Sequence, residues 1–197
     1  MREFNVTGVC TPKRHYMVDT RVKLEKIRVL IEKQKYFTIN RARQFGKTTT
    51  LNLLEKLLSP EYLCIQISFE GAGDTMFSSE AHFCDGFLRL IEEYLLSDHE
   101  ELVDEWVNTD ITSFIALSEH LNNVCQDKKV VLMIDEVDKT SSNKIFLHFI
   151  GMLRKKYLSR DKASVNTFHS VILAGVYDIR NIKLKLKNDG YYTEKEE

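Results

Sequence analysis

The sequence predicts an α/β fold with a mainly parallel sheet. Short apolar segments alternate along the chain with longer segments in which apolar residues recur every three or four positions. Strands that alternate with helices in this way form βαβ units and a parallel sheet. The segment 130–134 is apolar at every position (Val-Val-Leu-Met-Ile), which is typical of a strand covered by helices on both faces. The expected architecture is therefore a three-layer sandwich.

The pattern predicts each element in turn. Four strands are runs of apolar and β-branched residues that end at polar or turn-forming residues, at 36–40, 63–69, 130–134 and 171–174. Four helical segments follow from the spacing of Leu, Ile, Val and Phe, at 21–33, 47–58, 77 to about 126, and 145–157. Ser59-Pro60 ends the second helix because proline cannot continue it. Residues 1–19 are expected to be irregular and the charged residues 188–197 to be flexible.

The composition is that of an ordinary globular domain. The chain has 197 residues, of which 43% are hydrophobic and 29% charged, and at roughly 150 residues per domain it is expected to form a single domain, 1–197. The net charge of -1 gives no bulk attraction to nucleic acid, although local basic patches stay open. No apolar run suggests a membrane span or a secretory signal, so a cytoplasmic location is expected. Four scattered cysteines favour neither a zinc cluster nor a disulfide framework.

The first strand leads into Arg41-Ala42-Arg43-Gln44-Phe45-Gly46-Lys47-Thr48. The Walker A phosphate loop has the pattern Gly-x-x-x-x-Gly-Lys-Ser/Thr, and here the first glycine position holds Arg41. Gly46 permits a tight turn, Lys47 is expected to reach the β and γ phosphates, and Thr48 to bind Mg²⁺. The residues expected to contact the nucleotide are Arg43, Gln44, Phe45, Gly46, Lys47, Thr48 and Thr49. The alternative is a plain strand–turn–helix junction with a surface lysine.

The third strand ends in Asp135-Glu136, the Walker B arrangement. Parallel strands carry their ligands at their carboxyl ends, so Asp135 is expected to hold Mg²⁺, through a water molecule. Glu136 is expected to polarise a water for in-line attack on the γ phosphate. The alternative is an acidic turn after a buried strand, and Asp138 and Lys139 are read as loop structure.

These segments resemble a known family. Residues 36–48 resemble the phosphate loop of the predicted AAA-ATPase-like proteins, prokaryotic relatives of the AAA+ and STAND P-loop NTPases, in which arginine commonly stands at the position of Arg41. Ala42 replaces the family's usual proline. The acidic motif is similar to residues 134–138 and a later strand to residues 172–180. Val18-Asp19 matches an element near the place where related ATPases hold adenine.

The resemblance covers roughly residues 4–187 and implies the P-loop NTPase fold with an AAA+-like core. It implies a parallel sheet in which the phosphate-loop strand lies next to the acidic-motif strand. It also implies ATP rather than GTP. Family members continue into a helical lid and often a nuclease-like domain, both of which are expected to be absent from this chain.

The sequence therefore predicts a Mg²⁺-dependent ATP-binding domain that hydrolyses ATP, with Lys47 and Glu136 as catalytic residues and Thr48 and Asp135 as metal ligands. One alternative is a nucleotide-gated interaction module with little turnover. Another, less favoured because no acceptor-binding arginine lid is seen, is a small-molecule kinase. ATP and ADP are the expected ligands, and a partner protein or a second copy of the chain stays open.

Two basic segments have plainer interpretations. Arg154-Lys155-Lys156 and Arg160 follow the acidic strand, where related ATPases can place an arginine finger that acts across a subunit interface. A basic helix end, favoured by the helix dipole, is the preferred interpretation. Lysines alternate with leucines over residues 183–187, which favours a solvated face over a nucleic-acid contact.

Overall fold

The fold is an α/β sandwich built on a four-stranded parallel sheet. The computed structural model describes residues 19–40, 46–107, 110–139 and 143–175. The strands are β1 (Tyr36–Asn40), β2 (Leu63–Ser68), β3 (Val130–Asp135) and β4 (Ser170–Gly175). Every pairing is parallel, which confirms the predicted fold class. The predictions for residues 1–18 and 188–197 lie outside the described residues, and the assignment of one domain to the whole chain stays a prediction.

The order of the strands corrects one expectation. The sheet runs β1-β4-β3-β2, so β4 separates the phosphate-loop strand from the acidic-motif strand, which were expected to be neighbours. Burial explains the arrangement. All six residues of β3 and of β4 are buried, whereas β1 is only partly buried. The two strands that are apolar on both faces therefore take the centre of the sheet, where neighbouring strands and both helical layers cover them.

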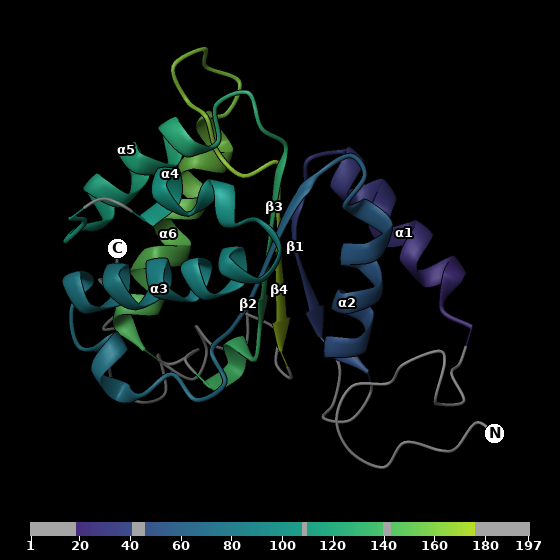
Figure 1. The fold of residues 1–197 in the computed structure, drawn as a ribbon, viewed down its shortest axis with the longest axis horizontal. Coiled ribbons are helices and arrows are strands. Elements are labelled where there is room, and N and C mark those ends of the chain that lie inside the picture. The colour runs from purple at the N-terminus through teal and green to yellow at the C-terminus, as the bar shows by residue number, and fades with distance from the viewer. Residues whose placement is uncertain (1–18, 41–45, 108–109, 140–142, 176–197) are drawn as a thin grey trace, which may run out of the picture.

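Helices cover both faces of the sheet (Figure 1). On one side lie α1 (Arg21–Glu32) and α2 (Lys47–Leu58), and on the other lie α3 (Glu80–Asp98), α4 (Val103–Val107), α5 (Phe114–Val124) and α6 (Lys144–Ser159). Successive residues of a strand point to opposite faces. Accordingly, Leu132 of β3 belongs to the core beneath α3, α5 and α6, and its neighbours Val131 and Met133 belong to the core beneath α1 and α2.

The helical segment predicted from residue 77 to about 126 is divided in the structure. Short 3₁₀ turns, Asp74–Phe77 and Glu100–Leu102, flank α3, and α5 starts anew at Phe114. Serines explain the two starts. The Ser79 hydroxyl accepts a hydrogen bond from the His82 N–H, and the Ser113 hydroxyl accepts one from the Ala116 N–H. Each serine satisfies a backbone donor that would otherwise lack a partner in the first turn, and so fixes where its helix begins.

Phenylalanine side chains fill the core between the sheet and the larger helical layer. Phe149 on α6 belongs to this group, with its ring centroid 4.8 Å from that of Phe83 and 5.0 Å from that of Phe87. Phe83, Phe87 and Phe149 are fully buried. Aromatic pairs at these separations add to the stabilisation that burial provides, so Phe149 links α6 to α3 through a large apolar contact.

We expect Phe149→Ala to lower the free energy of unfolding by about 3–5 kcal/mol, because it leaves a cavity where a large buried ring was. Urea unfolding followed by circular dichroism measures the change. Ile115→Ala on α5 is the control. Ile115 is 75% exposed, so its truncation should change the same free energy by no more than about 0.5 kcal/mol. Equal effects of the two variants would contradict the position of Phe149 in the core.

Candidate functional site

The helix α2 begins directly after a glycine in a left-handed conformation. Gly46 precedes the helix with φ 69° and ψ 34°, a left-handed conformation that glycine adopts without steric cost. It has no side chain with which to cap the helix. The first backbone bond of α2 runs from the Thr50 N–H to the Gly46 carbonyl over 2.9 Å. The N–H groups of Lys47, Thr48 and Thr49 come before that bond, at the positive end of the helix dipole.

The end of β3 lies against this helix start. The Thr48 hydroxyl donates a hydrogen bond of 2.5 Å to Oδ2 of Asp135, across 87 positions of sequence. The other carboxylate oxygen, Oδ1, accepts the Glu136 N–H at 2.9 Å. Asp135 is only 2% exposed. Its carboxylate is therefore held in one orientation by a side chain of α2 and by the backbone of its own turn.

Glu136 turns sharply after the strand. Its φ is 57°, a left-handed conformation that costs a non-glycine residue of order 1–3 kcal/mol. The Glu136 carboxylate Oε1 lies 3.9 Å from Nζ of Lys47. Lys47 is 5% exposed and Glu136 19%, so this ion pair is largely shielded from water. The turn brings the Glu136 side chain to Lys47.

The Thr48 and Asp135 side chains suit a magnesium ion. Mg²⁺ prefers hard oxygen ligands and is usually held by one or two carboxylates together with water and substrate phosphate. A hydroxyl and a carboxylate meet here at one point. Within the described ranges, no three His, Cys, Asp or Glu side chains gather into a metal cluster. A magnesium ion at Asp135 would therefore need phosphate and water oxygens to complete its coordination.

The structure brings together most of the residues predicted for the site. Gly46, Lys47, Thr48 and Thr49 lie at the start of α2, and Asp135 and Glu136 lie at the end of β3. The remaining predicted nucleotide contacts, Arg43, Gln44 and Phe45, are outside the described residues.

Sequence reasoning missed Gly175, the last residue of β4. A Cβ atom at this position would lie 3.0 Å from Oδ1 of Asp138 and 3.0 Å from Cγ2 of Val137. These two residues belong to the 3₁₀ turn Val137–Lys139 that follows Glu136. The absence of a side chain at Gly175 therefore lets the acidic turn pack against β4. A glycine that ends an apolar strand was the available signal.

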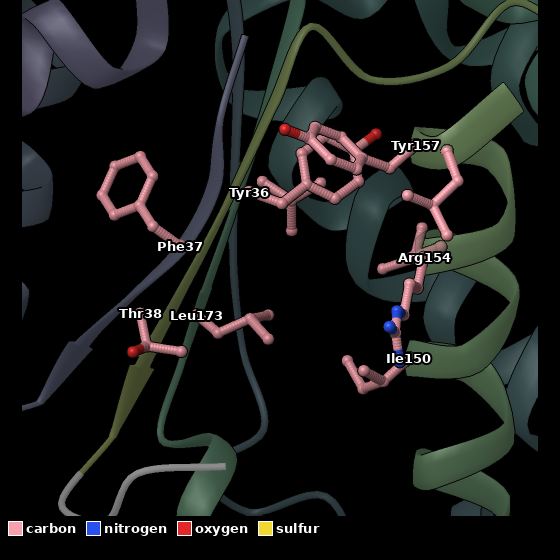
Figure 2. A pocket seen from close by; sticks show the side chains of 10 residues that line it. Tyr36, Phe37, Thr38, Ile150, Arg154, Tyr157 and Leu173 are labelled. Atoms are coloured by element: carbon pink, nitrogen blue, oxygen red, sulfur yellow. The ribbon is translucent and has the colours of Figure 1, made fainter. Parts of the chain in front are cut away.

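An apolar groove lies elsewhere, between α6 and the strands β1 and β4 (Figure 2). Its volume is about 280 Å³, and its lining includes Tyr36, Ile150, Arg154 and Tyr157. The rings of Tyr36 and Tyr157 lie 4.6 Å apart between centroids, and burial raises the pKa of the Tyr36 phenol. Neither Lys47 and Thr48 at the start of α2 nor Asp135 and Glu136 at the end of β3 line this groove. The groove is therefore distinct from the candidate site.

The candidate finger residues on α6 have structural contacts. The Lys156 ammonium donates hydrogen bonds to the Ser118 carbonyl at 2.8 Å and to Oδ1 of Asn122 at 2.7 Å, and so ties α6 to α5. Burial lowers the pKa of Lys156. The Arg160 guanidinium stacks on the ring of Tyr157, 4.0 Å from its centroid. These contacts agree with the preferred interpretation, in which this basic segment belongs to the end of α6.

A parallel sheet in the order β1-β4-β3-β2, a helix that begins at Gly46-Lys47-Thr48 and a strand that ends in Asp135-Glu136 together define the P-loop NTPase fold. A solved structure shares this fold. The Walker-type ATPase of Pyrococcus abyssi superposes with a TM-score of 0.58 at 11% identity, covering 93% of this chain and 52% of that one. The ORC2 protein of Aeropyrum pernix, solved as ADPNP-ADP complexes, gives a TM-score of 0.47 at 12% identity, with 95% and 47% covered.

The chain spans about half the length of the solved structures that it matches. No protein-family model and no curated protein matches it by sequence. The structural likeness agrees, at the level of the fold, with the resemblance to AAA-ATPase-like proteins. Among the described helices, none has the length and apolar character needed to cross a membrane. The cytoplasmic location stays a prediction.

We expect Gly175→Ala to lower the free energy of unfolding by about 1–3 kcal/mol, because the added methyl group overpacks the turn that carries Asp138. Gly151→Ala is the matched control. Gly151 lies inside α6, and an added Cβ would meet nothing within 4 Å. Alanine should therefore raise stability there by up to about 1 kcal/mol. Denaturant unfolding of both variants measures the two signs, and a stabilised Gly175→Ala would contradict the close packing.

Proposed function

We propose that the chain binds ATP with Mg²⁺ and hydrolyses it. One observation carries this proposal. The side chains of Lys47 and Thr48 at the start of α2 meet Glu136 and Asp135 at the end of β3, through an ion pair of 3.9 Å and a hydrogen bond of 2.5 Å. An ordinary strand–turn–helix junction with a surface lysine does not account for a lysine that is 5% exposed and faces a carboxylate. The preference for ATP comes from the family resemblance.

Each residue has a distinct role in the proposed reaction. The Lys47 ammonium and the first N–H groups of α2 bind the β and γ phosphates. The Thr48 hydroxyl and the Asp135 carboxylate hold the metal, which when bound neutralises charge on those phosphates. The Glu136 carboxylate accepts a proton from the water whose oxygen attacks the γ phosphorus, while the bond to the ADP oxygen breaks.

The ion pair between Lys47 and Glu136 also favours a second function. Lys47 interacts with the same carboxylate that would act as the base. A bound γ phosphate competes for the lysine and releases Glu136. The turn after β3 then has two arrangements that depend on the nucleotide, as a switch requires. A nucleotide-gated interaction module with little turnover, which acts on a partner protein or a second copy of the chain, would use the same residues.

We expect Mg²⁺-ATP at about a hundred times its dissociation constant to stabilise the wild-type chain by about 2.7 kcal/mol. At about 2–4 °C per kcal/mol this raises the melting temperature by about 5–10 °C. Lys47→Ala should abolish the shift because it removes the cation that faces the phosphates, and EDTA should reduce it. Lys56→Ala, an exposed lysine on the same helix, is the control and should keep the full shift. An unchanged shift in Lys47→Ala would refute the site.

We expect Glu136→Gln to lower the rate of ATP hydrolysis by about 10²–10⁴-fold, the usual effect of losing a general base, while the dissociation constant for ATP changes little. Phosphate release and calorimetry measure the two quantities. Glu93→Gln, on the exposed surface of α3, should leave both unchanged. If the wild type and Glu136→Gln bind ATP equally and neither releases phosphate, hydrolysis is contradicted and the switch function remains.

A further inference from the structure

A lysine from α1 reaches the start of α2. Nζ of Lys23 lies 3.0 Å from the Thr50 hydroxyl oxygen. The same hydroxyl lies 2.7 Å from the carbonyl oxygen of Gly46, the residue that precedes α2. Thr50 is buried and Lys23 is partly buried. The chain of contacts therefore runs from α1, through the interior of α2, to the glycine of the phosphate loop.

The chemistry of the three groups fixes the direction of both hydrogen bonds. An ammonium group has donors and no acceptor, so Lys23 donates to Thr50. A carbonyl oxygen only accepts, so the single hydroxyl proton of Thr50 goes to Gly46. Lys23 thus donates to Thr50, and Thr50 donates to Gly46. The positive charge of Lys23 makes the Thr50 hydroxyl a stronger donor.

The Gly46 carbonyl is the acceptor for two donors of one residue. It receives the Thr50 N–H at 2.9 Å and the Thr50 hydroxyl at 2.7 Å. The same peptide unit carries the N–H of Lys47, the first amide of α2. Hydrogen bonds to the carbonyl of a peptide polarise its N–H and strengthen what that N–H donates. They also hold Gly46 in its left-handed conformation, φ 69°.

We propose that Lys23 is a positioning residue for the phosphate loop, acting through Thr50 on the Gly46–Lys47 peptide, so that α1 sets part of the affinity for the phosphates of a nucleotide. The proposal rests on the function proposed above. It differs from a purely structural tie between α1 and α2, because such a tie would change the free energy of unfolding and leave ligand affinity unchanged. Ile27 and Ile31, which are buried, already anchor α1 to the core.

The test is the dissociation constant of Mg²⁺-ATP and of Mg²⁺-pyrophosphate, measured by calorimetry on the full chain. Pyrophosphate has no base or sugar, so it reports on the phosphate site alone. We expect Lys23→Met to weaken the binding of both ligands by about 3- to 10-fold, and the loss of its hydrogen bond to Thr50 to lower the melting temperature without ligand by a few degrees at most. Lys26→Met, an exposed lysine on the same helix, should change neither constant.

A second pair of variants tests the route through the hydroxyl. Thr50→Val should weaken binding by a similar factor, and Thr50→Ser should restore it because serine keeps the donor. In the Thr50→Val background, Lys23→Met should have no further effect, since the lysine acts through the group already removed.

The outcomes separate the two proposals. Wild type that binds neither ligand overturns the proposed function together with this inference. Wild type that binds while Lys23→Met binds equally tightly overturns the inference alone. A loss confined to ATP, with pyrophosphate unaffected, also overturns it, because Lys23 would then act on the nucleoside part. Additive losses in the double variant contradict the route through Thr50.

Discussion

The parallel alignment of the strands is the constraint on which the candidate site depends. Because all four strands run the same way, their carboxyl ends meet at one edge of the sheet. The register places Asn40 beside Gly175 and Ser68 beside Asp135 at that edge. The start of α2, which follows β1, and the turn that follows β3 therefore lie at the same edge of the sheet. If β1 or β3 ran in the opposite direction, its carboxyl end would lie at the opposite edge, and Lys47 would be separated from Asp135 and Glu136.

The buried charges of the site are held by partners within the fold. Lys47 and Asp135 are 5% and 2% exposed, and an isolated buried charge is strongly unfavourable unless it is paired and hydrogen-bonded. Lys47, Asp135 and Glu136 together carry one positive and two negative charges, and the positive end of α2 offsets part of the excess. The strained turn at Glu136 adds to the energy held at the site.

The sequence predicted β1 and α2 correctly because the residues that set their limits lie within or next to these elements. The bounds of β1 and α2 in the structure match the predicted ranges 36–40 and 47–58, where an apolar run, a glycine and Ser59-Pro60 mark the limits. The order of the strands was predicted wrongly, since it depends on which strands bury both faces. The ion pair of Lys47 with Glu136 and the contact of Lys23 with Thr50 join residues far apart in sequence, and no local pattern reports them.

The site spans two layers of the fold, and this explains why several elements influence it. Lys47 and Thr48 belong to the layer of α1 and α2, whereas Asp135 and Glu136 belong to the edge of the sheet and to the turn packed against Gly175. A triphosphate with its metal would contact both layers at once. A small shift of α1 would be transmitted to the start of α2 by the contact of Lys23 with Thr50. A small shift of the 3₁₀ turn Val137–Lys139, which packs against Gly175, would move the acidic residues. Either shift would change the distance between the start of α2 and the end of β3. Two contacts among the described residues join α2 to the end of the sheet, the hydrogen bond of Thr48 with Asp135 and the ion pair of Lys47 with Glu136.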